Sequence, residues 1–295
     1  MGAKYDVIIV GAGPAGIFAA LELGEKTALK VLMLEKGADI EARRCPMQQT
    51  GVCAHCPICS IVSGWGGAGA FSDGKLTLTT AFGGWLDEYM DRHEVARLIK
   101  YVDDVYLRFG APSTVFGTDD ERIKEIQRQA AQADLNLIPA RIRHLGTEKC
   151  FTILRDMRRY LGERVDIRPR TAVRRLLVEE GRVRGVETER GETIPARYVI
   201  VAPGREGAEW FAGEAARLGL QTEVNPVDIG VRVEVPAVVL EHLTDVIYES
   251  KFVFFSKAFD DRVRTFCMNP YGEVVLENNG GLFTVNGHSY AEKRT

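Results

Sequence analysis

A glycine-rich hexapeptide, Gly11-Ala12-Gly13-Pro14-Ala15-Gly16, follows the apolar stretch Tyr5–Val10 and precedes a helix-like stretch, Ile17–Leu23. A second apolar stretch, Lys30–Leu34, ends directly before Glu35. The apolar stretches have the length of buried strands, and the glycines permit a tight turn between a strand and a helix. These segments therefore predict a βαβ unit, which restricts the chain to an α/β fold with parallel strands.

The hexapeptide has the spacing G-x-G-x-x-G, and Glu35 follows about 20 residues later, as in Rossmann-type dinucleotide sites. Gly13 has no Cβ, so the backbone can approach a pyrophosphate, and free N–H groups at the helix start attract its charge. The carboxylate of Glu35 can accept hydrogen bonds from ribose hydroxyls and would repel a 2′-phosphate. We therefore predict a dinucleotide site that includes Gly11–Gly16, Glu35 and the adjacent Lys36, and NADP is disfavoured there.

A later part of the chain distinguishes FAD from NAD. The segment Val165–Glu189 predicts a small sheet, and the strand that follows ends in Ala202-Pro203-Gly204. This order resembles the second FAD region of glutathione-reductase-type flavoproteins, although an ordinary strand-to-helix turn is the alternative. The resemblance implies that Val173 contacts the adenine through its backbone, and that Ala202 and Gly204 lie beside the cofactor. FAD is therefore the predicted ligand.

The most distinctive stretch is Ser63-Gly64-Trp65-Gly66-Gly67-Ala68-Gly69-Ala70-Phe71-Ser72-Asp73-Gly74-Lys75-Leu76. With the fingerprint, Ala202–Arg205 and Asn286-Gly287-His288-Ser289, it resembles a largely uncharacterised family of bacterial and archaeal FAD-dependent dehydrogenases. The resemblance runs along nearly the whole chain. It implies the fold and FAD, and it implies no substrate.

The glycines of this stretch also suggest a second cofactor loop, since successive glycines expose backbone N–H groups and permit close approach. The candidate cofactor residues in the loop are Gly66, Gly67, Ala68, Asp73 and Lys75. Lys75 would add positive charge near a phosphate or a reduced flavin, and Asp73 would orient a turn or accept from a ribityl hydroxyl. A flexible surface loop is the alternative.

Two arginines follow the second predicted strand closely. Arg43 and Arg44 are candidates for contacts with the FAD phosphates, and solvated side chains are the equal alternative.

Four of the six cysteines fall within a short segment, at Cys45, Cys53, Cys56 and Cys59. The short steps between them suit an iron–sulfur cluster, and four thiolates also suit a tetrahedral zinc site. Redox-active thiols beside the flavin are a third interpretation, and reduced cysteines without metal a fourth. We predict that the four act together, as one metal centre or as a redox set.

Periodicity predicts the remaining elements. The expected helices are Leu86–Phe109, Asp119–Ala133, Cys150–Leu161 and Gly207–Leu218, and the expected strands are Leu135–Ile142, Val165–Arg170, Thr171–Glu179, Arg182–Glu189, Glu192–Val201, Val227–Val235, Thr265–Leu276 and Leu282–Asn286.

These elements predict a Rossmann-like three-layer FAD-binding domain with helical and β insertions over residues 1–220. Its core comprises residues 1–80 and 160–220, and residues 86–160 form a helical insertion. A partial β-type substrate domain is expected over 225–295. Glutathione-reductase-type flavoproteins carry a Gly-Asp motif near the C-terminus, which this chain lacks. We therefore expect a C-terminal truncation or a split gene product.

The formal net charge is -3, and no apolar run reaches the roughly 18 residues of a membrane span. Neither nucleic acid nor a membrane is an expected partner, and the cytoplasm is the expected location. We predict an FAD-dependent oxidoreductase that exchanges electrons or hydride with an unidentified small molecule or protein. The alternatives are an electron-transfer flavoprotein with a cysteine-ligated centre, and a non-catalytic dinucleotide-binding module.

Overall fold

The computed structural model describes residues 4–72, 74–279 and 282–288. The chain divides into two compact units, each built from segments that are distant in the sequence. Unit 1 comprises Met1–Phe71, Leu154–Val231 and Leu276–Val285, and unit 2 comprises Ser72–Ile153, Arg232–Val275 and Asn286–Thr295.

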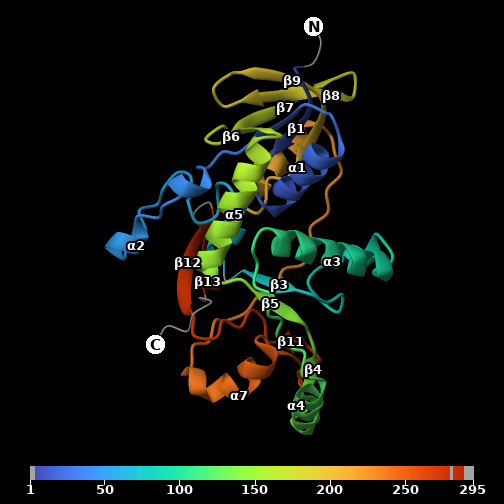
Figure 1. Cartoon of the computed structure of the whole chain (residues 1–295), viewed down its shortest axis with the longest axis vertical. Helices are drawn as coiled ribbons and strands as arrows, with labels where there is room; N and C mark the ends of the chain where they lie inside the picture. The colour runs from blue at the N-terminus through green and yellow to red at the C-terminus, as the bar shows by residue number, and fades with distance from the viewer. Residues whose placement is uncertain (1–3, 73, 280–281, 289–295) are drawn as a thin grey trace. The chain divides into compact units, whose positions relative to one another are not determined.

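Unit 1 contains a six-stranded sheet in the order β6-β2-β1-β9-β8-β7 (Figure 1). Four neighbours, β6, β2, β1 and β9, run parallel, while β8 pairs antiparallel with β9 and β7. The strands are β1 (Tyr5–Val10), β2 (Val31–Leu34), β6 (Asp166–Arg168), β7 (Val173–Glu179), β8 (Arg182–Thr188) and β9 (Thr193–Val201). The parallel part confirms the predicted Rossmann-like α/β class.

The centre of this sheet is apolar because β1 and β2 are covered on both faces. Ile8, Ile9 and Leu32 are fully buried, which is typical of strands in a parallel sheet. Helix α1 (Pro14–Lys26) connects β1 to β2 and buries its Ile17 and Leu21. Pro14 suits the first turn of a helix, where its missing N–H has no intrahelical partner.

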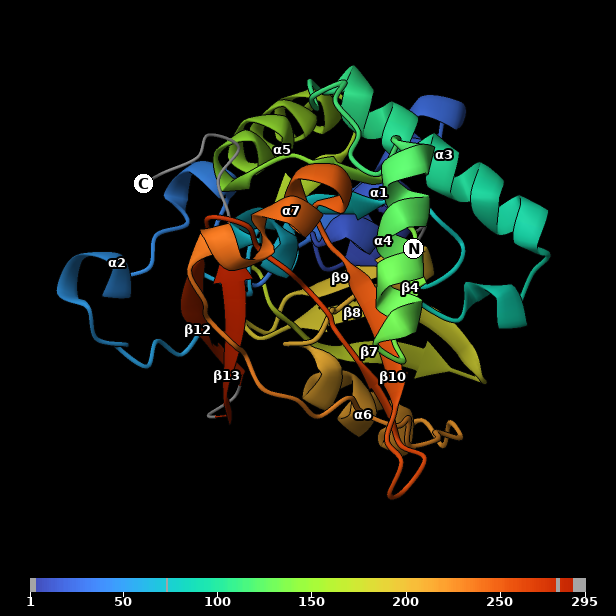
Figure 2. The same cartoon turned by 90° about the horizontal axis from the view of Figure 1, so that it is seen from below.

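Helix α6 (Ala208–Arg217) packs near the antiparallel strands of unit 1 (Figure 2). Trp210 and Leu218 pack against the buried cluster that contains Leu176 and Val186. The carboxylate of Glu214 accepts the backbone N–H of Leu176 in β7 at 2.7 Å. A buried acidic side chain therefore joins this helix to the edge strand of the sheet.

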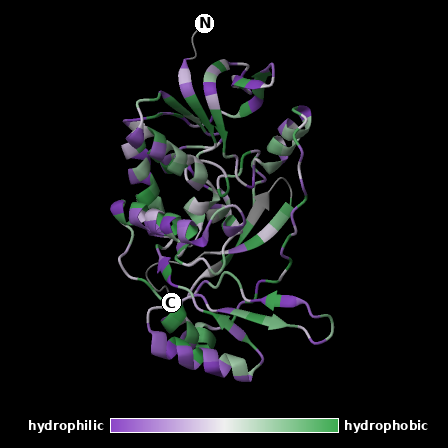
Figure 3. Ribbon diagram, turned by 90° about the vertical axis from the view of Figure 1, so that its right-hand side faces the viewer, coloured by the Kyte–Doolittle hydropathy of each residue, from purple (hydrophilic) through white to green (hydrophobic). Residues whose placement is uncertain are grey.

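Unit 2 holds helices α3 (Arg92–Arg108), α4 (Asp120–Gln132) and α7 (Ala237–Ile247), with two small sheets in the orders β11-β10-β4 and β3-β5. Its helices carry hydrophilic residues on one side and hydrophobic residues on the other, as the colouring of Figure 3 shows. The apolar sides of α4 and α7 meet in a cluster with Ile126, Leu137 and Ile247. The strands are β3 (Lys75–Thr77), β4 (Asn136–Ile138), β5 (Ile142–His144), β10 (Lys251–Phe255) and β11 (Arg262–Arg264).

Three further elements have residues in both units: α5 (Thr147–Gly162), β12 (Glu273–Asn279) and β13 (Leu282–His288). The last two pair with each other in a two-stranded sheet. Short helices also interrupt the glycine- and cysteine-rich region, namely η1 (Ile40–Ala42), α2 (Met47–Thr50), η2 (Gly67–Phe71) and η3 (Leu86–Glu88).

Several expected elements differ from the observed ones. The expected strand Val227–Val235 is wrong, because this segment has no strand partner among the described residues and Ile229 is 94% exposed. The expected strand Thr265–Leu276 becomes regular only at Glu273. Leu135–Ile142 forms two strands rather than one, since Pro139 separates them and lacks the N–H that a ladder needs.

One predicted helix is divided, and three elements were not predicted. The expected helix Leu86–Phe109 is divided into η3 and α3, because Asp91 caps the start of α3 by accepting the N–H of His93. Helix α7 and strands β10 and β11 were not predicted.

No helix in the described ranges has both the length and the apolarity needed to cross a membrane.

Candidate functional site

The site begins where β1 ends. Gly11 has φ +102°, and a Cβ on this residue would lie 2.2 Å from the carbonyl oxygen of Ala202. The N–H of Ala202 donates to the carbonyl of Val10 at 2.8 Å. Only glycine fits this turn. The carboxyl ends of β1 and β9 therefore lie side by side, at the edge where open α/β sheets bind ligands.

Gly13 lies at the start of α1, and its surroundings are open. A Cβ there would meet only the Cα of Gly67 within 4 Å, at 3.9 Å. No side chain caps the N-terminus of α1. The first N–H groups of the helix thus remain available to an anion, and they carry the positive end of the helix dipole.

The carboxylate of Glu35 joins three separate loops. Its Oε2 accepts the N–H of Ala12 at 2.8 Å, and its Oε1 accepts the N–H groups of Gly37 at 2.7 Å and Gly64 at 3.0 Å. A carboxylate offers about four lone-pair sites, so one remains, on Oε2. The predicted bond from Glu35 to a ribose hydroxyl stays a prediction, and this oxygen is where it would form.

The predicted glycine loop lies directly against the fingerprint. Gly66 donates its N–H to the carbonyl of Ala12 at 2.8 Å, and a Cβ on Gly67 would come within 3.1 Å of the Cα of Gly13. Both glycines have positive φ, +87° and +59°. Ala68 follows in η2. The structure thus brings Gly66, Gly67 and Ala68 to the predicted site, whereas Asp73 lies outside the described residues.

Arg43 is buried beneath this loop and is only 5% exposed. Its Nε donates to the carbonyl of Ser60, its Nη2 to those of Ser60 and Ile61, and its Nη1 to those of Trp65 and Gly67. These contacts use all five N–H groups of a guanidinium. A contact with cofactor phosphates, as the sequence suggested, would require some of these bonds to break. Burial lowers the pKa of Arg43 to about 10, although the nearby Glu35 opposes this.

The remaining predicted contacts of unit 1 lie on different elements. Lys36 forms an ion pair with Glu206, and burial lowers its pKa. Arg44 is exposed, and its predicted contact with the FAD phosphates stays a prediction. Val173 begins β7, two residues after Thr171, whose N–H donates to the carbonyl of Glu35 at 2.8 Å. Gly204, in the turn after β9, has φ +64°.

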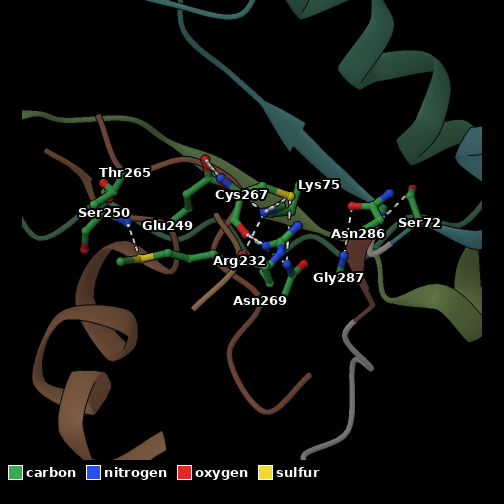
Figure 4. A network of polar contacts seen from close by, with 12 residues as sticks. Ser72, Lys75, Arg232, Glu249, Ser250, Thr265, Cys267, Asn269, Asn286 and Gly287 are labelled. Carbon is green, nitrogen blue, oxygen red and sulfur yellow. Dashed lines mark hydrogen bonds and ion pairs between the residues drawn. The ribbon is translucent and has the colours of Figure 1, made fainter. Parts of the chain in front are cut away.

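Lys75 belongs to a polar network within unit 2 (Figure 4). Its ammonium donates to Glu249 Oε2 at 2.5 Å, to the carbonyl of Met268 at 2.7 Å and to the sulfur of Cys267 at 3.8 Å. The side chains of Lys75 and Glu249 are each 8% exposed. The predicted role of Lys75 beside a phosphate or a flavin stays untested, and these contacts already engage its charge.

The same network fixes the backbone of Cys267, which has φ +57°. Its N–H donates to Glu249 Oε1 at 3.2 Å, and its carbonyl accepts from Arg232 at 2.6 Å and from Asn269 at 2.9 Å. Sequence analysis did not predict this network, because Cys267 lies 18 residues from Glu249 and 192 residues from Lys75 in the chain.

The predicted cysteine-ligated centre is not supported. Cys45, Cys53, Cys56 and Cys59 are all free, and among the described residues no group of three or more ligands could hold a metal. Cys56 is exposed. The carbonyl of Cys59 accepts the N–H of Ser63, in a turn whose Ser60 carbonyl accepts a hydrogen bond from Arg43. The loop therefore does not fold the thiols onto one point.

The residues of unit 1 fit FAD. The open space at Gly13, the uncapped start of α1 and the free lone pair of Glu35 line one edge of the sheet. This arrangement provides N–H donors for a diphosphate and an acceptor for a ribose, which are the parts that the adenosine diphosphate of FAD presents.

Comparison with known proteins agrees with this arrangement. Residues 5–95 match the family model described as pyridine nucleotide-disulphide oxidoreductase. The match includes the fingerprint, Glu35 and the glycine loop. It supports the predicted enzyme class, an FAD-dependent oxidoreductase, and the predicted cofactor, FAD.

An uncharacterized protein from Clostridium beijerinckii is 25% identical over 301 residues, covering 97% of this chain and 49% of that protein. The chain thus spans about half the length of this relative. Among solved structures, L-amino acid deaminase from Proteus vulgaris has a TM-score of 0.43 and 19% identity, covering 75% of this chain and 52% of that one. Glycine oxidase from Geobacillus kaustophilus has a TM-score of 0.42 and 17% identity, covering 75% and 60%.

Proposed function

We propose that the chain binds FAD at the carboxyl edge of the six-stranded sheet and takes part in an FAD-dependent oxidation. The observation that carries this proposal is the meeting of three loops at one point. Ala12 donates to Glu35, accepts from Gly66, and follows the Gly11 turn that packs on Ala202. This edge offers donors to a diphosphate and an acceptor to a ribose.

In this proposal the protein residues bind and orient. The first N–H groups of α1 hold the diphosphate, Glu35 Oε2 accepts one ribose hydroxyl, and Gly13 leaves room for the phosphates. FAD, when bound, supplies the capacity to take up a hydride or electrons. The chain need not contribute a catalytic acid or base of its own, and the sequence and the described residues identify none.

The finer identity of the enzyme belongs to the same proposal. The resemblance of Ser63–Leu76 favours the bacterial and archaeal FAD-dependent dehydrogenases over other flavoproteins. The reductant and the acceptor are a small molecule or a protein, and the expected cytoplasmic location is likewise a proposal. The spacing G-x-G-x-x-G recurs at Gly64–Gly69, but this stretch follows no strand and runs into η2, so it does not begin a second βαβ unit that could bind a nicotinamide donor.

The test is the identity of the ligand. Protein purified without added cofactor is denatured by heat, and the released material is separated by chromatography; the same protein, stripped of ligand, is then titrated with FAD and with NAD. We expect FAD to be released and to rebind with quenching or a spectral shift of the flavin. Release of a nicotinamide dinucleotide alone, or the absence of FAD binding, would contradict the proposal.

A further inference from the structure

We infer that Arg43 is a positioning residue for the cofactor site: it holds the loop Gly64–Gly67 against the fingerprint and does not itself bind the phosphates. This inference rests on the proposed binding of FAD by unit 1. It assigns to Arg43 a role different from the phosphate contact that its position in the sequence suggested.

Arg43 has a hydrogen-bond acceptor for every N–H of its guanidinium. The five N–H groups of Arg43 point at carbonyls of Ser60, Ile61, Trp65 and Gly67, at distances from 2.7 to 3.0 Å. These carbonyls lie at both ends of the segment 60–67, so one guanidinium fixes the path of the whole loop. An ammonium has three donors on one atom and cannot reach the same set.

The side chain of Arg43 is also buried. Arg43 is 5% exposed, and its guanidinium lies 4.9 Å from the centre of the Phe71 ring. A buried charge is tolerated only where polar groups surround it, and here the carbonyls provide that environment. Turning the guanidinium towards a phosphate would leave these carbonyls without their donors. Arg43 therefore favours its present position whether or not a ligand is bound.

The loop that Arg43 holds lies against the predicted cofactor site. The loop that Arg43 holds places the N–H of Gly66 on the carbonyl of Ala12 and the backbone of Gly67 against Gly13. Glu35 holds the same loop from another side through the N–H of Gly64. The loop thus forms one wall of the open space at Gly13, and its position determines the width of that space.

The test compares Arg43→Lys with Arg44→Lys, since Arg44 is the exposed neighbour and both substitutions leave the net charge unchanged. Amide hydrogen exchange of residues 60–71 is measured on protein stripped of flavin, and the Kd for FAD is measured by titration at low and high salt. We expect Arg43→Lys to speed exchange at Gly64–Gly67 by tenfold or more and to weaken FAD binding by about tenfold at both salt concentrations. Arg44→Lys should change neither quantity.

Two results would overturn the inference. Unchanged exchange in the loop together with unchanged affinity would show that Arg43 is dispensable. Unchanged exchange with a loss of affinity that disappears at high salt would show a direct phosphate contact, because screening weakens such a contact.

A second variant covers the case in which Arg43→Lys does not fold. Arg43→Gly leaves a cavity of guanidinium shape, and we expect methylguanidinium, but not methylammonium, to restore FAD binding. Equal effects of the two ions, or no rescue by either, would contradict the inference. Another outcome is that the wild-type protein binds no FAD while Arg43→Lys still speeds amide exchange at Gly64–Gly67 in the flavin-free protein. That result would contradict the proposed function and support the positioning role of Arg43.

Discussion

Glu35 Oε2 accepts the backbone N–H of Ala12 at 2.8 Å, which ties the residue after β2 to the turn after β1. The same carboxylate accepts two further backbone N–H groups, from Gly37 and Gly64. Glu35 therefore organises the ligand edge of unit 1 before any ligand arrives. The residue that the fingerprint assigns to ribose recognition also has a structural role.

Replacement of Glu35 by Gln should destabilise the flavin-free protein. An amide offers one acceptor oxygen, and its NH2 group would face a backbone N–H, so at least one buried donor loses its partner. We expect the free energy of unfolding to fall by about 2 kcal/mol, the usual range for hydrogen bonds to a charged group. Urea denaturation of stripped protein measures this. Glu22→Gln, at an exposed ion pair with Lys26, is the control and should change stability little. An unaltered midpoint for Glu35→Gln would show that the three contacts do not persist in solution.

Replacement by alanine should destabilise the protein at one glycine of the fingerprint and leave its stability unchanged at another. Gly11→Ala places a Cβ 2.2 Å from the carbonyl of Ala202 and forces φ +102° on alanine, so folding should suffer by about 2 kcal/mol or more. Gly13→Ala meets no atom closer than 3.9 Å, and φ is -76° there. Its stability without flavin should match the wild type.

The affinity for FAD should also reveal the effect of Gly13→Ala that stability does not. Gly13→Ala should weaken the Kd for FAD by tenfold or more, because the added methyl occupies the space left for the phosphates. Thermal unfolding of stripped protein and flavin titration measure the two effects. A Gly13→Ala protein that binds FAD normally would show that the phosphates do not pass this residue.

The buried pair Lys75–Glu249 should behave as a coupled unit. Removing one partner leaves a buried charge without compensation, which typically costs about 3–5 kcal/mol. We expect Lys75→Met and Glu249→Leu each to be strongly destabilising, and the double variant to be less destabilised than the sum of the two. Urea unfolding of the four proteins gives the coupling energy. Strict additivity would mean that the pair is not formed in solution.

The parts of unit 1 that could be predicted are those fixed by neighbours in the sequence. Tyr5–Val10 is apolar and short, and the glycines after it admit few conformations, so β1 and its turn follow from local rules. The start of α4 follows similarly, because Asp119 caps it by accepting the N–H of Arg122. Helix α1, by contrast, begins at Pro14, three residues before the predicted Ile17.

The parts that could not be predicted depend on contacts between distant residues. The alternation in Val227–Val235 is typical of a strand, yet a strand also needs a partner, and periodicity does not supply one. Four cysteines are close in the sequence, yet among the described residues they do not come together as one set of metal ligands, because spacing does not determine the path of the loop between them. The partners of Lys75 are 174 to 193 residues away in the chain, so no local sequence pattern predicts them.

Glu214 gives a prediction on the pH dependence of stability. Its carboxylate accepts from Arg217 at 2.7 and 2.8 Å and from the N–H of Leu176 at 2.7 Å. The hydrogen bond from Arg217 lowers the pKa of Glu214 below its ordinary value of 4.5, burial opposes this, and the N–H of Leu176 adds to the lowering.

The shifted pKa of Glu214 determines how its contribution to stability changes with pH. Because the pKa of Glu214 is lower in the folded protein than in the unfolded one, its contribution to stability is complete above pH 4.5 and is lost as the pH falls through the folded pKa. Glu214→Gln removes the charge at every pH. The variant should therefore be less stable than the wild type at pH 7, and the difference should shrink steadily below about pH 4.5. Urea unfolding of both proteins between pH 7 and pH 3.5 measures it, with the exposed Glu209→Gln of the same helix as control. A difference that stays constant over this range would mean that the bonds to Glu214 do not depend on its charge.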